Sequence, residues 1–395
     1  MQQDITTSAE DSLHASRTRI RIAVSLFYFC QGLAFSSWAS RIPTLKENLQ
    51  LTEAQLGTIL LMLPVGQLVT MALSGKLVTK YGSANVLRIV VIIYALILCS
   101  IGLATNALQL AAILFTFGVV GNMCNIAVNT QGVAAEKIFQ KSIMSSFHGA
   151  WSIAGFTGAL IGLLTMNIGI DTLQHFIIIL FLIIVNTLFN HKHLVQGKPE
   201  QKEKRSFFSR PEKSLMQLGI IGFFSMATEG AMFDWSGVYF KDIVGAPANL
   251  VIVGYASFMI MMATGRFVGD YVISRLGRKI TLQISGILMF TGMMLSVLFP
   301  QFWLCTFAFM LVGIGVACNI PTVYSLAGQN KKVPSGVALA MVSSVSYLGF
   351  LLGPPLIGYI AEIFSLRYSY GVFAFFGLLM FVMTSKLKIF RETAD

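Results

Sequence analysis

Charged side chains are scarce in this sequence. Asp, Glu, Lys and Arg make up 11% of its 395 residues, whereas soluble domains carry about 25%. Hydrophobic residues make up 55%. So few charges cannot cover the surface of a water-soluble protein of this length, and most of the surface must face lipid. Composition therefore overrules the roughly two or three soluble domains that length alone would allow.

Nucleotide and metal motifs are also missing. The sequence has no G-x-x-x-x-G-K-[ST] loop and no H-E-x-x-H pair, which disfavours a nucleotide-driven pump and a membrane metalloprotease. Its five cysteines lie in apolar runs, with neither metal-ligand spacing nor a disulfide framework, and we interpret them as buried thiols. We therefore expect no enzyme activity, no cofactor and no metal site. The net charge of +11 would suit nucleic acid, but the basic residues lie in short loops between apolar runs, so we expect no nucleic-acid partner.

Long apolar runs are what the sequence has instead. A helix crosses a bilayer with about 20 mostly apolar residues, and windows of that size predict twelve spans in this chain. The predicted spans of the first half are 20–40, 54–77, 84–104, 107–133, 143–165 and 172–191. Those of the second half are 215–239, 249–273, 279–299, 302–327, 335–361 and 368–388. Residues 1–16 are polar and partly acidic, unlike a transit peptide, so the first span is expected to stay uncleaved.

Lys and Arg residues mark one side of the membrane. If the N-terminus is cytoplasmic, 23 of the 28 Lys and Arg residues fall in cytoplasmic segments. The opposite loops hold only Arg41, Lys46, Lys241 and Arg367, and Arg266 lies inside a span. This asymmetry predicts cytoplasmic N- and C-termini in a multi-pass protein of the plasma membrane, here expected to be a bacterial inner membrane.

The two halves resemble each other at a nearly constant offset. Four short motifs recur in the same order, 194–198 residues apart: Gln31-Gly32 and Glu229-Gly230, Lys80-Tyr81-Gly82 and Arg275-Leu276-Gly277, Cys124-Asn125-Ile126 and Cys318-Asn319-Ile320, Gly155-Phe156 and Gly349-Phe350. Four matches in order indicate a duplicated six-helix unit. Transporters built from parallel repeats bind their solute near the membrane midplane, between the halves.

The stretch between the halves, residues 192–213, carries seven Lys and Arg residues and two prolines. This composition is typical of a solvated linker, and attraction to anionic lipid is the alternative. We therefore predict five segments: a cytoplasmic tail (1–16), a six-helix bundle (17–191), the linker (192–213), a second six-helix bundle (214–390) and a cytoplasmic tail (391–395).

A family resemblance follows from the loop after the second span. Gly75-Lys-Leu77-Val-Thr79-Lys80-Tyr-Gly82 resembles the G-x-L-x-D-R-x-G-R-R signature of the major facilitator superfamily, with Thr79 where the family has Asp. Its counterpart is Gly269-Asp270 followed by Arg275-Leu-Gly277-Arg278. The stretches 147–151 and 229–235 are similar to the fucose-permease-like branch. Over residues 17–390 the resemblance implies an all-α membrane protein with twelve transmembrane helices in two pseudo-symmetric six-helix bundles. It also implies a monomer that moves a small solute across the bilayer by alternating access.

Ionisable residues inside spans are costly and mark functional sites. Glu229 lies near the middle of the seventh span, and Asp234 follows five residues later, pointing about 140° away. A carboxyl group at bilayer depth favours its protonated form, as a proton carrier requires. Glu229 and Asp234 are therefore our proton-coupling candidates. As alternatives, Glu229 is a neutral hydrogen-bonding group between helices, and Asp234 pairs with Arg41 or Lys241.

The resemblance does not transfer the coupling mechanism. Fucose-permease-like proteins place proton-linked acids in spans one and four, where this chain has Gln31 and the amides Asn122, Asn125 and Asn129. These three amides share one helical face and either line a cavity or join helices. The substrate-binding candidates are Gln31, Asn122, Asn125, Asn129, His148, Trp151, Asn319, Tyr324 and Tyr347. We expect all of them except Asn122 and Tyr324 to converge on a central cavity between the halves, with Glu229 at or near its wall.

Three further residues predict a cytoplasmic gate, namely Lys80, Asp270 and Arg275. An acid beside a helix end, with bases in the equivalent loops, can hold one conformation of the carrier. Amides and aromatic rings suit a polyhydroxylated solute, so the predicted function is uptake of a sugar-like solute with the proton as coupling ion. The alternative is efflux of amphipathic compounds, which an apolar cavity with one acid would favour.

Overall fold

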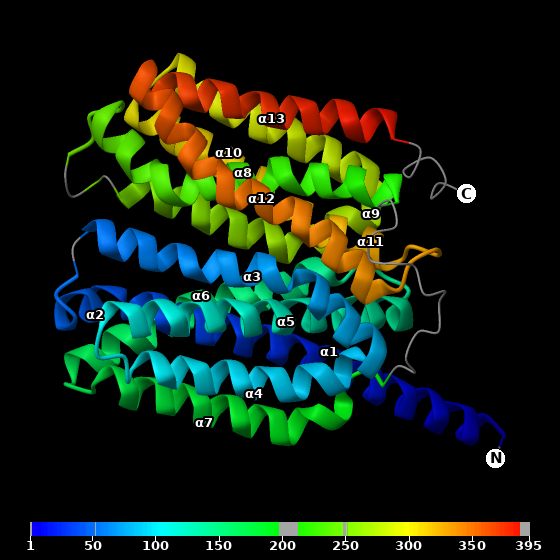
Figure 1. The fold of residues 1–395 in the computed structure, drawn as a ribbon. Coiled ribbons are helices and arrows are strands. Elements are labelled where there is room, and N and C mark those ends of the chain that lie inside the picture. The colour runs from blue at the N-terminus through cyan, green and yellow to red at the C-terminus, as the bar shows by residue number, and fades with distance from the viewer. Residues whose placement is uncertain (1, 52, 197–211, 248–249, 251, 388–395) are drawn as a thin grey trace. The chain divides into compact units, whose positions relative to one another are not determined.

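Apolar runs with few internal polar groups fold as helices in lipid, because every backbone N–H and C=O must be bonded within the segment. The computed structural model describes residues 2–51, 53–196, 212–247, 250 and 252–387, and these residues form helices and no strands. Figure 1 shows the course of the chain. The all-helical class predicted from the sequence is confirmed.

The described residues of the first half form six long helices and two short ones. In chain order they are α1 (Gln2–Ser40), α2 (Ile42–Asn48), α3 (Glu53–Tyr81), α4 (Ser83–Ile101), α5 (Ala107–Phe139), α6 (Met144–Asn167), α7 (Thr172–Asn190) and the 3-10 turn η1 (His191–His193). The residues expected as a polar tail, 1–16, are largely part of α1, which begins at Gln2.

The second half follows the same plan with different breaks. Its helices are α8 (Lys213–Asp242), α9 (Ile252–Leu298), α10 (Phe302–Ala317), α11 (Asn319–Gly328), α12 (Ser335–Ile363) and α13 (Leu366–Lys386). Most of the predicted linker, 197–211, and the predicted tail, 391–395, lie outside the described residues.

Eleven helices in the described part of the chain are long and apolar enough to cross a bilayer. One of them, Val253–Leu298, has 46 residues, which is roughly 70 Å of helix against a hydrocarbon core of about 30 Å. Gly277 inside it has φ 79° and ψ 160°, which is not helical. The chain therefore kinks where the sequence predicts the boundary between spans 249–273 and 279–299.

The equivalent position of the first half carries the same backbone feature. Gly82, between α3 and α4, has φ 82° and ψ 142°. Positive φ is accessible to glycine at little cost. The two glycines are 195 residues apart, as the repeat requires.

Two local features differ from the predicted spans. A short helix, α2, follows the first span, where the sequence analysis assigned only a loop. The predicted span 302–327 is interrupted at Cys318, which separates α10 from α11. Pro321 follows within one turn, and a proline lacks the N–H that would continue the hydrogen-bond ladder.

Polar caps set the ends of two helices. The Asn106 side chain accepts a hydrogen bond from Gln109 N at the start of α5, and Asp171 forms a capping box with Gln174 at the start of α7. Such caps satisfy N–H groups that have no partner within the helix.

Two compact units make up the fold. Unit 1 falls within Met1–Lys141, Ala150–Glu203 and Gly328–Ala340, and unit 2 within Ser142–Gly149, Lys204–Ala327 and Met341–Asp395. In unit 1, α5 packs against α1, α3 and α4; in unit 2, α9 packs against α8, α10 and α13.

Equivalent contacts recur inside the units. Gln131 Nε2 donates to Ser83 Oγ at 2.7 Å, and Arg278 Nη2 donates to Ser325 Oγ at 3.0 Å. These pairs occupy the same positions of the repeat, displaced by 194 and 195 residues. The repeat read from four short motifs thus extends to tertiary contacts.

Close helix crossings recur as well. A Cβ added to Gly118 would lie 2.0 Å from Leu63 O, and one added to Gly313 would lie 2.4 Å from Phe258 O. All four residues obey the 195-residue offset. Only a residue without a side chain lets these backbones approach so closely.

Candidate functional site

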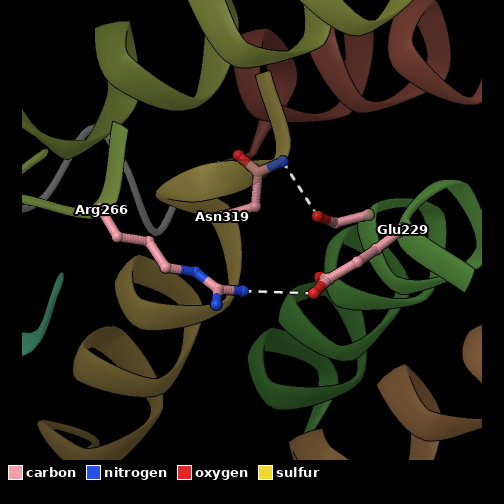
Figure 2. Close-up of polar contacts among 4 residues, drawn as sticks. Glu229, Arg266 and Asn319 are labelled. Carbon is pink, nitrogen blue, oxygen red and sulfur yellow. Dashed lines mark hydrogen bonds and ion pairs between the residues drawn. The ribbon is translucent and has the colours of Figure 1, made fainter. Parts of the chain in front are cut away.

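A buried ion pair lies inside unit 2. Glu229 stands near the middle of α8, and Arg266 stands near the middle of the part of α9 before Gly277. Arg266 Nη2 donates to Glu229 Oε1 at 3.2 Å, and both side chains are buried (Figure 2). A lone charge at this depth is costly, and the opposite charge offsets part of that cost.

A buried amide stands beside the pair. Asn319, the first residue of α11, donates through Nδ2 to Ser225 Oγ at 3.0 Å and to Gly315 O at 2.9 Å. Ser225 lies one turn before Glu229, on the same face of α8. Figure 2 shows the Asn319 amide nitrogen directed toward α8. Among the described residues, its Oδ1 is buried without a hydrogen-bond partner.

Two more predicted site residues meet in unit 2. The rings of His148 and Tyr324 lie 6.2 Å apart between centroids, and Tyr324 is buried. His148 belongs to the first turns of α6, the part of that helix that falls in unit 2. Tyr347, on α12, has its ring 6.3 Å from that of Phe350.

Asp234 has a different environment from Glu229. It is exposed, and no hydrogen bond or ion pair of its side chain is found among the described residues. The suggested partner Arg41 bonds instead to His175 Nδ1 (3.1 Å), Thr165 Oγ1 (2.9 Å) and the Ile170 carbonyl (3.0 Å). The other suggested partner, Lys241, is exposed near the end of α8.

The three amides of α5 are hydrogen bonded within unit 1. Asn122 Nδ2 donates to Ser74 Oγ on α3 at 2.9 Å, and Tyr28 on α1 donates its hydroxyl to Asn129 Oδ1 at 2.9 Å. Asn129 Nδ2 in turn donates to Asn125 Oδ1 at 3.2 Å. Asn122 and Asn129 therefore join helices, and the half-buried Asn125 bonds along its own helix.

The remaining predicted binding residues of unit 1 lie on α1 and α6. Gln31 is buried, and its Oε1 has no partner among the described residues. The rings of Trp151 and Phe35 are 6.1 Å apart between centroids. A Cβ added to Gly32 would lie 2.7 Å from Trp151 O, so α1 and α6 approach closely here.

The predicted gate residues have separate partners. The Asp270 carboxylate accepts hydrogen bonds from the backbone N–H groups of Ser145 and Ser146, each at 2.9 Å, and from Ser146 Oγ. It therefore caps the start of α6, where an anion is favoured by the helix dipole. Arg275 lies over the Tyr271 ring at 5.5 Å and Lys80 over the Tyr81 ring at 5.0 Å. Among the three predicted gate residues, Asp270 is thus the one whose contacts within the described chain reach a different helix.

Sequence reasoning missed Arg266 and Ser225. The signal for Arg266 was present, because it is the one Lys or Arg that the charge pattern left inside a span. Ser225 was recognisable only through the repeat. It stands 197 residues after Tyr28, and each of the two residues bonds an asparagine of the fourth span of its own half.

The buried pair, the amide beside it and the duplicated helices define a polytopic membrane protein with polar groups held at bilayer depth. The chain belongs to the Major Facilitator Superfamily, whose family model matches residues 24–333 and 267–393. The membership inferred from the loop signature is confirmed. Transporters make up this family, and the chain is accordingly a multi-pass membrane protein.

Known proteins resemble this chain in sequence or in fold over nearly its whole length. An uncharacterized MFS-type transporter of Yersinia pestis is 30% identical over 371 residues, covering 94% of this chain and 96% of that protein. The E. coli fucose:proton symporter FucP superposes with a TM-score of 0.73 at 15% identity, covering 93% of this chain and 97% of FucP. The human organic anion transporter MFSD10 (TETRAN) gives a TM-score of 0.76 at 13% identity, covering 93% of this chain and 99% of MFSD10.

Proposed function

We propose that the protein is a proton-coupled secondary transporter for a small polar solute, built from twelve spans in two six-helix bundles with both termini cytoplasmic. Sugar-like solutes are favoured over amphipathic ones. The observation that carries this proposal is the buried cluster of Glu229, Arg266 and Asn319 inside unit 2.

Such a cluster is expensive to keep in a membrane protein that has no use for it. Hydrophobic residues of similar volume are often as stable as a buried ion pair, or more so. Ionisable residues at bilayer depth accordingly mark solute and proton pathways. A carboxylate held by a guanidinium can accept a proton and release its partner, which gives the carrier two charge states.

The fold agrees with this assignment. FucP is a fucose:proton symporter, and the present chain has the same fold. The polar groups of the present chain include amides and aromatic rings. Asn319, His148 and Tyr324 supply the hydrogen-bonding and ring surfaces that a hydroxylated solute needs. Asp234 is the weaker proton candidate, because it is exposed and lacks the buried partner that Glu229 has.

Conformational control is assigned to Asp270. Its carboxylate binds two N–H groups at the start of α6, and α6 continues from unit 2 into unit 1. A bond at that helix end is suited to hold one state of the transport cycle and to break in the other. Alternating access then requires the Asp270 cap to form and open with each turnover.

Ligand-induced stabilisation tests the proposed solute class. A bound ligand raises the unfolding temperature by mass action. We expect purified protein to be stabilised by some member of a panel of monosaccharides and their oxidised or aminated derivatives. Stabilisation by lipophilic cations alone would replace this proposal with efflux of amphipathic compounds.

A further inference from the structure

Asp234 is an acid at bilayer depth that the buried cluster does not use. In a helix centred in the bilayer it would lie roughly 10 Å from the midpoint of α8, inside the roughly 15 Å half-thickness of the hydrocarbon core. It is exposed, whereas Gly230 and Ala231, one turn before it, are buried. A carboxylate that faced lipid at this depth would be costly, so Asp234 must open on water or on a polar ligand.

The other acids in this part of unit 2 have partners. Glu229 accepts a hydrogen bond from Arg266, and Asp270, one turn after Arg266 on α9, accepts hydrogen bonds at the start of α6. Lys241 follows Asp234 two turns later on α8, but no ion pair joins them in the described chain. The charge of Asp234 is therefore left without a bonded cation among the described residues, and a cationic ligand would supply one.

Aromatic rings surround the residue next to Asp234. The ring centroid of Phe233 is 6.1 Å from that of Tyr255, 5.8 Å from that of Phe258 and 6.2 Å from that of Phe350. Tyr255, on α9, is half-buried and lies within electrostatic reach of the Asp234 carboxylate. The face of an aromatic ring attracts a cation, and most strongly where water is excluded. An ammonium group bound to Asp234 would therefore have an aromatic ring beside it.

Neighbouring polar groups favour a hydroxylated cation over a lipophilic one. The Tyr255 hydroxyl makes no hydrogen bond among the described residues, and Tyr255 also lies within electrostatic reach of Glu229. Beside Glu229, the buried Asn319 has its Oδ1 without a partner in the same part of the chain (Figure 2). Polar groups left without partners are costly. The hydroxyl groups of a polar solute can bond to them, whereas a lipophilic cation cannot.

We propose, building on the transport function above, that the solute is a small hydroxylated amine of the amino-sugar class. Asp234 binds its ammonium group, and the Tyr255 ring packs against that group. Glu229 keeps the proton, so the two acids of α8 have separate tasks.

The binding experiment uses matched probes that differ at one nitrogen. They are D-glucosamine, N-acetyl-D-glucosamine and D-glucose, together with the corresponding galactose series. Thermal unfolding of the purified full chain in detergent is followed with each probe, in mildly acidic buffer that keeps the amines protonated. We expect stabilisation by at least one amino sugar, and a weaker response to its N-acetyl analogue and to the parent sugar.

Asp234→Asn tests the ammonium contact. It should weaken binding of the amino sugar by about tenfold to a hundredfold, the range of hydrogen bonds to charged groups. Binding of the N-acetyl analogue should change little, which a general structural defect would not reproduce. Asp242→Asn, an exposed acid at the end of the same helix, is the control and should bind as wild type. Lys241→Gln should do so too, and a loss as large as that of Asp234→Asn would mean a structural pair and overturn the inference.

Two variants of Tyr255 separate its ring from its hydroxyl. Tyr255→Phe keeps the ring and should keep the preference for the amino sugar over its N-acetyl analogue. Tyr255→Leu removes the ring and should reduce that preference about twofold to fivefold, the size of a cation–π contact. An unchanged preference in Tyr255→Leu would contradict the proposed site.

Failure of this inference and failure of the transport function give different results. Equal stabilisation by an amino sugar and its parent sugar, or unchanged binding of the amino sugar by Asp234→Asn, overturns the inference and leaves proton-coupled transport standing. No stabilisation by any amino sugar also overturns it, and stabilisation by tetraphenylphosphonium alone overturns the sugar-like class as well. Asp234-dependent binding without accumulation under a pH gradient in proteoliposomes supports the inference and removes proton coupling.

Discussion

Arg266 and Glu229 face each other across 3.2 Å between α9 and α8, and both side chains are buried. The pair neutralises the two charges locally, so it is stable only while both partners are present. A transporter can use that dependence, because a proton on one partner changes what the other can bind.

Removing one partner of this pair should destabilise the protein more than removing both. Arg266→Gln leaves a buried carboxylate without its cation, at a cost of about 3 kcal/mol or more. The double variant Glu229→Gln/Arg266→Gln should recover a large part of that loss. Chemical unfolding in detergent of the two single variants and the double variant measures the coupling energy directly. Strictly additive losses would show that the contact contributes nothing.

Asp270→Asn should loosen the start of α6. The variant keeps the shape of the side chain but loses the negative charge that accepts from the N–H groups of Ser145 and Ser146. Loss of a negative charge at a helix start typically costs about 0.3–1 kcal/mol, and it should make engineered cysteines near Ser146 more reactive. Asp242→Asn, an exposed acid at the end of α8, is the control. Equal reactivity in Asp270→Asn and wild type would remove Asp270 from the gate.

Gly313→Ala should destabilise unit 2, and Gly118→Ala should do the same for unit 1. The added Cβ would lie 2.4 Å from Phe258 O or 2.0 Å from Leu63 O, respectively. Overpacking of this kind costs about 1–3 kcal/mol. Gly155→Ala is the matched control, since its Cβ would meet nothing within 4 Å. If Gly118→Ala and Gly313→Ala both unfold at midpoints as high as that of the wild type, the helices do not approach each other so closely at these glycines.

The orientation of the chain is testable at two exposed positions. Lys331→Cys should be protected from a membrane-impermeant maleimide in intact cells, and Ile168→Cys should react. Four of the five native cysteines are buried, so the background should be low. The reverse pattern would place both termini outside and contradict the charge asymmetry.

Hydropathy predicted the helical class and the positions of most long helices, because lipid requires long apolar runs in spanning helices. Even the kink at Gly277 coincides with a predicted boundary, because the glycine belongs to a recognisable loop motif. The break at Cys318 and the short helix α2 were not predicted, since neither changes the average apolarity of its window.

The candidate site was harder to read from sequence. Glu229 was identifiable as an acid at bilayer depth, but its partner stands 37 residues away, and no local spacing connects the two. The partners of Asp270 lie about 125 residues away and include two backbone N–H groups, which carry no side-chain signature, beside the hydroxyl of Ser146. By contrast, the placement of Arg275 over Tyr271 follows from helical i, i+4 spacing and was within reach of the sequence.

Proton-driven accumulation in proteoliposomes tests the central claim most directly. With a solute identified by thermal stabilisation and a pH gradient of one unit, alkaline inside, wild-type protein should concentrate that solute about tenfold, the factor that one pH unit supplies per proton. Glu229→Gln should bring the solute only to equal concentrations on both sides, yet still exchange internal for external solute, because the amide stands in for the protonated acid. Concentration of the solute by Glu229→Gln to the wild-type level would show that Glu229 is structural and contradict the account.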